Sequence, residues 1–592
     1  MDVISIALIT TIGLCVVFVI IGLWFKKFVV SSEDFMLAGR KVPFWLMAAG
    51  YLGGFVGGSS VAGYVSLGYT DGISGMWTSL FVITGMVLFV IIFVRRLNAF
   101  GRKTGAVTMA DFVCARYGEK LRLPVSIIGF LRPGVIIGMQ FLAIAIVANI
   151  MFGIDMKVGV FIGAIVMLLY LVTAGQYSAL VNQWLQSILQ SLGILLFAIA
   201  AIKIIGNPGE AVDAMFKALP PEMMNLWKVD FSMFTVWLLT FGLFYFVDPW
   251  MYMWSYMAKS PRTSSNGMLA ILGASYFNVL PFIAGIVLVA GAMLGRISIP
   301  DGLSGDALYA WFATSNMGLV SGVLVLSGLI MTIVSCASSF AMNGVTLLTR
   351  DIYNKVINKK ATEKQLLVAS RLSLIVVVVI GILCANWLPI LVPLWSLGQA
   401  IVIAGLFACT MSAWFWKRST TAGALASTII GGLGAFGWAC YAWIETGSPG
   451  SLMFGLHACH VGLALSIPVM IIVSLVTKPE YEKAEITSYK KLGEEIKIYT
   501  PEAEAITRPG LYGWLGADIK SWKIFWPCVF GVFILHYILA FAFHVPTATL
   551  IITWLGLIVS VFMILQLTIM GAKDAYYLVK EGKAEKAASS AS

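Results

Sequence analysis

The chain has 592 residues, of which 60% are hydrophobic and 11% are charged, and its formal net charge is +11. A water-soluble domain of this length needs more charge to cover its surface, so this composition excludes a soluble globular protein. Long apolar segments such as Ile4–Phe25 and Thr549–Met570 reach the roughly 20 residues that a helix needs to cross a bilayer. They lack the polar and apolar alternation of a membrane β-barrel. We therefore predict an all-α membrane protein of the cell membrane.

The apolar segments predict about 15 membrane-spanning helices. In chain order these spans lie near residues 4–25, 44–69, 76–96, 123–152, 157–175, 180–205, 232–257, 267–295, 316–349, 367–386, 388–414, 420–443, 458–477, 524–544 and 548–570. No basic residue precedes the first segment, so we interpret it as a retained span rather than a signal peptide.

The basic residues predict the orientation of these spans. With the N-terminus outside, the loops rich in Lys and Arg all fall on the inner side of the membrane. These loops are 26–41, 95–122, 259–262, 350–364, 417–418, 478–523 and the tail after Lys573. The opposite loops are poor in Lys and Arg, as the positive-inside rule requires. We attribute the positive net charge to this topology and expect no nucleic-acid partner.

The second predicted span contains a run of glycines. They are Gly50, Gly53, Gly54, Gly57 and Gly58, and Ser59 and Ser60 follow them. Each glycine costs a helix about 1 kcal/mol relative to alanine. Inside a membrane such a run favours either close packing of a neighbouring helix or an unwound stretch whose carbonyls face a ligand. Composition alone leaves both interpretations open.

The seventh predicted span contains Asp248-Pro249. Proline removes a backbone donor and interrupts a helix, and a carboxylate beside such a break within a membrane is a candidate functional group. The two interrupted spans, the second and the seventh, are five spans apart. This spacing is typical of an inverted repeat of five plus five helices around a central binding site.

Two further spans carry polar residues. Arg132 lies about ten residues into the fourth span, roughly 15 Å deep at 1.5 Å per residue. We expect it to bind a carboxylate of a ligand; the alternatives are a structural pair with Asp248 or extension to the inner surface. The ninth span carries Thr332, Ser335, Cys336, Ser338, Ser339, Asn343 and Thr346. Such an oxygen-rich face suits a hard cation, although hydroxyls also bond to their own helix.

Four stretches give the chain a family resemblance. They are Asp34–Arg40 with Pro43-Phe44-Trp45, Thr108–Gly118 with Arg122, Ser335–Tyr353, and Phe415–Arg418 with Gly423-Ala424. In their order and spacing, over about residues 30–480, the chain resembles the sodium/solute symporter family, the relatives of the sodium–galactose, sodium–proline and sodium–sialic acid carriers. The resemblance implies a LeuT-like fold with a leading helix, a five-plus-five inverted core at spans two to eleven, and trailing helices.

The resemblance also implies a function and site residues. The family couples sodium to uptake of a sugar, an amino acid or an organic acid, and Arg132 favours a carboxylate solute. The family's sodium site would use carbonyls of Gly53, Val56 and Thr332 with the side chains of Ser335 and Cys336. A second sodium site of the sialic acid branch would fall on Ser335, Ser338, Ser339 and Gln183. Solute contacts would come from Ser59, Ser60, Arg132, Gln140, Phe244, Tyr245 and Gln399.

Two of the departures from the family pattern affect groups that could bind the cation. Cys336 stands where the family usually has Ser or Thr, and a thiol is a soft ligand for a hard ion. Asn182-Gln183 stands where the family usually has an Asp. Proton coupling, with Asp248 as the titrating group, is therefore an alternative to sodium coupling. A solute sensor that binds without transporting is a further alternative on the same fold.

The predicted organisation follows from these spans. It comprises a leading helix (1–30), the first part of the transport core through the broken seventh span (44–256), the rest of the second repeat (257–418), trailing helices (419–477), a cytoplasmic loop (478–523), and two last helices with a basic tail (524–592).

The sequence also argues against other functional classes. It contains no Gly-rich phosphate loop or nucleophile elbow, so we expect neither an enzyme nor a cofactor apart from Na+ as the coupling ion. His457-Ala458-Cys459-His460 is interpreted as a polar interfacial cluster rather than a metal site. The expected partners are a small-molecule solute and the lipid bilayer, without an obligate protein partner.

Overall fold

The computed structural model describes residues 3–25, 29, 31–171, 175–269, 271–387 and 389–499. The two last predicted spans, near 524–544 and 548–570, and the basic tail lie outside the described residues. Within the described ranges the chain forms helices and no β-strand, apart from two isolated β-bridges, Val42–Ala258 and Met453–Leu456.

The helices follow in chain order. The first are α1 (Val3–Phe25), α2 (Ser32–Leu37), α3 (Phe44–Phe55), α4 (Tyr64–Asp71), α5 (Met76–Phe89), α6 (Arg95–Thr104), α7 (Met109–Tyr117), α8 (Arg122–Phe152), α9 (Met156–Leu171), α10 (Gly175–Ile205) and α11 (Pro208–Ala218). The others are α12 (Phe231–Trp237), α13 (Pro249–Met257), α14 (Pro261–Met268), α15 (Ile271–Met293), α16 (Leu308–Ser315), α17 (Leu319–Thr346), α18 (Glu363–Trp387), α19 (Leu391–Phe415), α20 (Thr421–Thr446), α21 (Ala458–Val476), α22 (Tyr481–Ala484) and α23 (Tyr489–Ile498).

Short π-helical or 3-10 segments connect several of these helices. The π-helical segments are η3 (Ser59–Gly63), η5 (Val90–Val94), η8 (Leu238–Gly242) and η11 (Leu347–Ile357). The 3-10 segments are η2 (Ala38–Arg40), η4 (Gly72–Gly75), η6 (Glu119–Leu121), η7 (Pro221–Met224), η9 (Leu243–Val247) and η10 (Gly305–Ala307).

Within the described residues, ten helices are long and apolar enough to cross a membrane. Three shorter apolar helices, Phe44–Phe55, Met156–Ile165 and Val279–Met293, accompany them. The prediction of an all-α, multi-pass membrane protein is therefore confirmed. The finer count of about 15 spans and the outside position of the N-terminus stay predictions.

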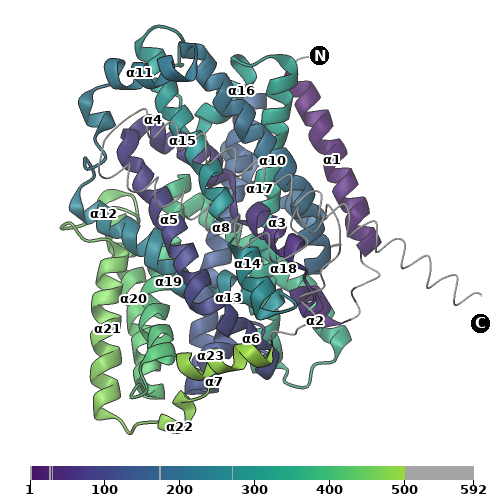
Figure 1. Ribbon diagram of the computed structural model, residues 1–592, viewed down its shortest axis with the longest axis vertical. Coiled ribbons are helices and arrows are strands. Elements are labelled where there is room, and N and C mark those ends of the chain that lie inside the picture. The colour runs from purple at the N-terminus through teal and green to yellow at the C-terminus, as the bar shows by residue number, and fades with distance from the viewer. Residues whose placement is uncertain are drawn as a thin grey trace, which may run out of the picture.

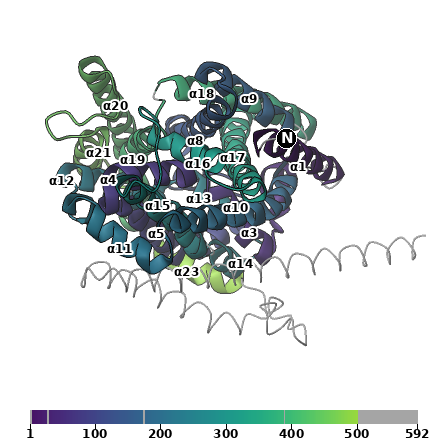
Figure 2. The same cartoon turned by 90° about the horizontal axis from the view of Figure 1, so that it is seen from above.

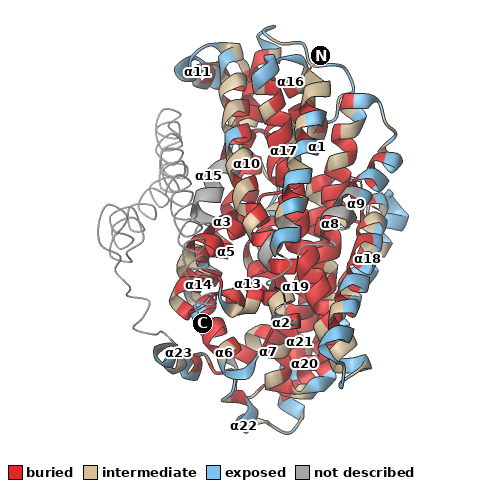
Figure 3. Ribbon diagram, turned by 90° about the vertical axis from the view of Figure 1, so that its right-hand side faces the viewer, coloured by how far each residue is buried: buried red, intermediate tan, exposed pale blue. Residues whose placement is uncertain are grey.

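The helices form one bundle (Figures 1 and 2), and Figure 3 shows that its centre is buried. All nine residues of α13 are buried, and α10 packs against both α3 and α17. The peripheral helices instead expose apolar side chains, such as Ile12 of α1 at 55% and Leu372 of α18 at 58%. Figure 3 shows exposed residues along the outer sides of α1 and α18. Such apolar exposure is stable where the surrounding solvent is lipid rather than water.

Glycines set the closest crossing between α4 and α15. A Cβ added at Gly285 would lie 2.2 Å from the backbone oxygen of Val65, and one added at Gly68 would lie 2.1 Å from that of Phe282. Small residues of this kind let membrane helices approach until their backbones touch. The two helices therefore cannot keep this separation with a larger side chain at either glycine.

Gly285→Ala is expected to lower the thermal unfolding midpoint of the purified protein, because the new methyl group would force α4 and α15 apart. Overpacking of this kind costs about 1–3 kcal/mol. Gly437→Ala in α20 is the matched control, because no atom lies within 4 Å of a Cβ placed there. Equal midpoints for the two variants would contradict the close crossing.

A buried ion cluster joins α7, α8 and η11 near the lower end of the molecule in Figure 1. Arg122 Nη1 lies 2.8 Å from Oδ1 of Asp111 and 2.8 Å from Oδ1 of Asp351. The Thr108 hydroxyl donates a 2.9 Å hydrogen bond to the same oxygen of Asp351. These residues belong to the stretches that carry the family resemblance, and the structure gives them a role in holding three segments together.

The polar segment after α21 lies across the same end of the bundle. In α23, the ring of Tyr489 lies 3.6 Å below the guanidinium carbon of Arg96, and its centroid is 5.4 Å from that of Phe415. Lys103 and Glu495 form an ion pair of 2.6 Å. Helix α23 is thus an amphipathic helix within the predicted cytoplasmic loop, and it connects α6 to α19.

Candidate ion and solute site

The second predicted span is broken, as its glycines suggested. Helix α3 ends at Phe55, and Val56 has an extended backbone with φ −71° and ψ 118°. Helical structure resumes before η3 and continues into α4. The last carbonyls of a helix lack intrahelical donors, so the break opens the backbone oxygens of α3 to other groups.

The same glycines also allow close packing against the break. A Cβ at Gly53 would lie 2.7 Å from the backbone oxygen of Gln183 in α10. One at Gly57 would lie 2.8 Å from the sulfur of Cys336 in α17. The interruption and the close packing therefore occur together: α3 is unwound after Phe55, and its glycines admit α10 and α17.

The seventh predicted span is broken at the expected residue. After α12 the chain passes through η8 and η9, and Asp248 then has an extended backbone with ψ 113°. Helix α13 begins at Pro249, and Oδ1 of Asp248 accepts a 3.0 Å hydrogen bond from the Trp250 amide. One oxygen of this carboxylate therefore caps α13. The other, Oδ2, has no hydrogen-bond partner among the described residues.

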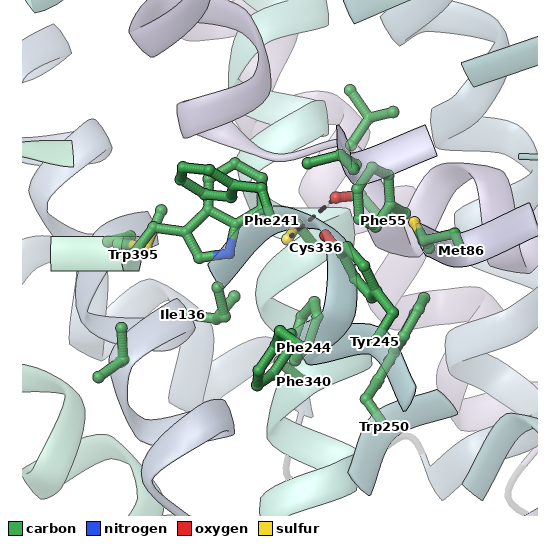
Figure 4. Packing of buried hydrophobic residues seen from close by; sticks show 14 of the residues in the cluster. Phe55, Met86, Ile136, Phe241, Phe244, Tyr245, Trp250, Cys336, Phe340 and Trp395 are labelled. Atoms are coloured by element: carbon green, nitrogen blue, oxygen red, sulfur yellow. Dashed lines mark hydrogen bonds between the residues drawn. The ribbon is translucent and has the colours of Figure 1, made fainter. Parts of the chain in front are cut away.

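Side chains of α17 reach the open carbonyls of α3. The Ser335 hydroxyl donates a 2.7 Å hydrogen bond to the Gly53 carbonyl. The Cys336 thiol lies 3.9 Å from the Phe55 carbonyl (Figure 4). Ser335 thus reaches Gly53, one of the carbonyls that the resemblance implied, whereas Cys336 approaches the carbonyl of Phe55 rather than that of Val56. This arrangement brings a hydroxyl, a thiol and two backbone oxygens to one place.

Two other residues of this predicted cation site were implied through their backbone carbonyls. Val56 is the extended residue that directly follows α3. The Thr332 hydroxyl donates a 2.7 Å hydrogen bond to the Gly328 carbonyl one turn earlier in α17. That side chain therefore bonds to its own helix, which leaves only the Thr332 carbonyl as a candidate ligand, as the resemblance implied.

A second polar group lies between α10 and α17. Gln183 Nε2 donates a 3.2 Å hydrogen bond to the Ser338 hydroxyl, which itself donates a 2.8 Å bond to the Ser335 carbonyl. The Ser339 hydroxyl instead accepts a 2.9 Å bond from Trp250 Nε1 of α13. The structure thus joins Gln183 to Ser338 and Ser335, whereas Ser339 connects α17 to the second broken helix.

Arg132 lies beside the second break and is only 1% exposed. Its Nη2 is 3.4 Å from Oδ2 of Asp248, and its guanidinium carbon lies 4.9 Å from the ring centroids of Phe244 and Phe340. Nε and Nη1 have no hydrogen-bond partner among the described residues. Arg132 therefore faces the centre of the bundle, pairs loosely with Asp248, and keeps unused donors.

The other predicted solute contacts are buried near the same breaks. Gln140 Oε1 accepts a 2.9 Å hydrogen bond from the Gly58 amide, which links α8 to the start of the resumed helix. The Tyr245 hydroxyl and both amide atoms of Gln399 are buried without hydrogen-bond partners among the described residues. Ser60 is also buried, and the side chain of Ser59 lies outside the described part.

An aromatic wall surrounds these polar groups, and sequence reasoning missed most of it. Trp250 stacks on Tyr51 at 4.9 Å and on Phe340 at 5.0 Å between ring centroids. Figure 4 shows Phe55, Phe244, Tyr245, Trp250 and Phe340 gathered around Cys336. Phe340 could have been predicted from the sequence, because it lies four residues after Cys336 and therefore on the same face of α17.

Known proteins resemble this chain in sequence and in fold. The model of the sodium:solute symporter family matches residues 35–431. A sodium/proline symporter of Staphylococcus aureus (strain bovine RF122 / ET3-1) is 24% identical over 486 residues, which cover 78% of this chain and 91% of the relative. The substrate-bound, outward-open state of a Na+-coupled sialic acid symporter has a TM-score of 0.67 at 18% identity, covering 80% of this chain and 98% of that chain.

These comparisons confirm two predictions. The structural likeness confirms a LeuT-like helical fold. The family match spans well over half of the chain and includes the two broken helices, the ion cluster and Arg132. This chain therefore belongs to the sodium:solute symporter family, whose members are membrane transporters rather than enzymes.

Proposed function

We propose that this symporter couples sodium entry to the uptake of a small organic acid or other carboxylate. The observation that carries this proposal is Arg132, a buried guanidinium beside the second broken helix with two nitrogens free of hydrogen bonds among the described residues. A guanidinium in such a site binds a carboxylate through two parallel hydrogen bonds. The solute's carboxylate would occupy the donors that Asp248 leaves unused.

Sodium is proposed to bind where α17 meets the break in α3. Ser335 and the carbonyls of Gly53 and Phe55 supply oxygen, the element that a hard cation prefers. The Gln183–Ser338 pair is proposed as a second cation position. An ion bound at the first position would join α3 to α17 and would hold the break in one geometry.

Coupling follows from which helices the two ligands connect. The ion bridges α3 and α17, whereas the solute bridges Arg132 of α8 and the broken helix that ends in α13. If both sites favour the same conformation, each ligand raises the affinity for the other. We propose that the two breaks frame a five-plus-five inverted repeat with the N-terminus outside, and that joint occupancy permits opening toward the inner side.

The direct test is uptake into proteoliposomes. A sodium gradient at equal pH on both sides is compared with a pH gradient in sodium-free buffer. We expect solute accumulation only with the sodium gradient. Accumulation that ignores sodium and follows pH would assign coupling to protons, with Asp248 as the candidate group. Sodium-dependent binding without accumulation would indicate a sensor.

The only loosely paired carboxylate of Asp248 favours a second candidate solute, an amino acid. Its ammonium group would pair with Asp248 Oδ2 while its carboxylate binds Arg132. Competition experiments should compare a 2-hydroxy acid, the amino acid with the same carbon skeleton, and its amide. Competition by both acids but not by the amide supports a carboxylate solute, and a strong preference for the amino acid adds a role for Asp248.

Cys336→Ser is expected to lower the sodium concentration needed for half-maximal uptake by about three- to tenfold, which corresponds to roughly 1 kcal/mol. A hydroxyl is a harder ligand than a thiol and binds Na+ better. The control is Cys409→Ser, a buried thiol of α19 that bonds to its own helix at Leu406. An unchanged sodium requirement in Cys336→Ser would remove this side chain from the ion site.

A further inference from the structure

An apolar groove of about 450 Å³ lies on the surface of the helix bundle, between η11 and α18. Its η11 wall begins where α17 ends, about three helical turns beyond Ser335 and Cys336. The groove is therefore separate from the proposed ion site. Its walls are mainly apolar and include Ile352 and Ile357 of η11 and Val368, Leu372 and Val376 of α18.

The wide turns of η11 shape this groove. The Asn358 amide bonds to the Tyr353 carbonyl five residues earlier at 2.7 Å, which is the spacing of a π-helix. π-helical turns are rare and often mark functional sites. Beneath the groove, the hydroxyls of Thr349 and Ser373 form a 3.2 Å hydrogen bond that holds η11 against α18. The groove is therefore built between two segments that are fixed to each other.

The groove opens toward lipid. Helix α18 is one of the ten candidate membrane spans of the described chain. Its groove-lining Val368 and Leu372 are 49% and 58% exposed, and Ile357 opposite is 69% exposed. Figure 3 shows the exposed residues along this side of α18. A contiguous apolar hollow in this position is a binding surface, and hydrocarbon is the solvent that it meets.

Two cations lie on the same face as the groove. Lys364 lines it in the first turn of α18, and Arg371 follows seven residues later, on the same side of the helix. Both are exposed, and within the described part of the chain neither forms an ion pair. The neighbouring Glu363 is already engaged, because it accepts a 2.7 Å hydrogen bond from the Ser32 amide.

We propose that this groove binds an anionic phospholipid, with one acyl chain between η11 and α18 and the phosphate held by Lys364 and Arg371. An arginine on the lipid-facing side of a span reaches toward headgroups because its charge is costly among acyl chains. By the predicted topology this end of α18 is the inner one, where anionic lipids attract basic residues. The site is independent of the solute and of the coupling ion.

Native mass spectrometry of the purified protein tests this proposal. Phosphatidylglycerol and phosphatidylcholine with identical chains are added separately, and retained lipid is counted. The wild type is expected to retain phosphatidylglycerol preferentially. The double variant with Lys364→Gln and Arg371→Gln should show a smaller preference for phosphatidylglycerol over phosphatidylcholine. The reduction should be roughly fivefold for each cation removed. Lys157→Gln with Lys203→Gln is the matched control, because it removes two exposed cations from the opposite side of the predicted topology.

A groove-filling variant tests the acyl-chain part of the proposal. Val368→Trp should lower the retention of both lipids, because the indole would occupy the space between η11 and α18. An equal thermal unfolding midpoint checks that each variant is folded. Equal retention of the two lipids by the wild type would overturn the proposal. Undiminished phosphatidylglycerol binding in the Lys364/Arg371 variant, or undiminished retention in Val368→Trp, would also overturn it.

Discussion

Arg132→Gln is expected to weaken the binding and uptake of carboxylate solutes strongly. The guanidinium is buried, and its polar contact with the protein is a 3.4 Å approach to Asp248. Truncating one partner of a buried charged pair costs about 2–5 kcal/mol of binding. Because 1.4 kcal/mol is a factor of ten, solute affinity should fall about 30-fold or more. Competition against a labelled solute in proteoliposomes measures this loss.

The same substitution also affects folding, so a second variant is needed. Glutamine at 132 leaves Asp248 buried without its cation, and breaking a buried pair costs about 3–5 kcal/mol of stability. Arg132→Gln with Asp248→Asn removes both charges and should recover much of the thermal stability, yet carboxylate uptake should stay weak. Wild-type uptake by this double variant would make Arg132 purely structural. An equal loss for neutral and anionic solutes in Arg132→Gln would lead to the same conclusion.

Ser335→Ala is expected to raise the sodium concentration for half-maximal uptake by about tenfold or more, equivalent to 1.4 kcal/mol. Ser335 is the α17 hydroxyl that reaches the carbonyl of Gly53 at the break, at 2.7 Å. Its removal takes one oxygen from the proposed ion position and leaves the buried carbonyl without its donor. Initial uptake rates over a range of sodium concentrations, at constant ionic strength, provide the measurement.

The control for this variant lies on the same helix. Thr346 is buried in α17, but its hydroxyl bonds to the Met342 carbonyl of its own helix at 2.7 Å. Thr346→Val keeps the side-chain shape and should leave the sodium requirement unchanged. If Ser335→Ala and Thr346→Val change the sodium requirement equally, the change results from general damage to α17 rather than from the loss of an ion ligand.

The helix breaks could be predicted because their causes are local. Pro249 cannot continue a hydrogen-bond ladder, and the glycines before Ser59 weaken a helix in any context. Composition could not decide whether those glycines unwind α3 or admit neighbours, because that depends on where α10 and α17 pass. The structure shows both, with Val56 extended and Gly53 beneath the backbone of Gln183.

Contacts between distant segments could not be predicted. The bond from Trp250 to Ser339 joins residues 89 positions apart, and the bond from Gly58 to Gln140 joins residues 82 apart. No periodicity encodes such pairs, because they depend on how whole helices cross. The family resemblance placed Gln140 in the solute site and Ser339 in the second sodium site, but it did not provide the bond partners that the structure shows.

Helix ends show a similar limit. The ninth span was expected at residues 316–349, and α17 indeed runs from Leu319 to Thr346. The chain then continues as η11 to Ile357, beyond the apolar segment. The buried Asp351 and its bond to Arg122 stabilise this extension, so tertiary contacts rather than hydropathy set the boundary.

Cysteine modification tests most directly that the broken helices line the transport site. Cys336 is only 3% exposed here, so a membrane-permeant maleimide can reach it only when the site opens to water. Peptide mass spectrometry of proteoliposomes in potassium, in sodium, and in sodium with solute would give the modification rate, with Cys409 as internal reference. Modification of Cys336 that slows in sodium and slows further with solute is the expected result. A rate that is identical in all three conditions would contradict a cation and solute site at these breaks.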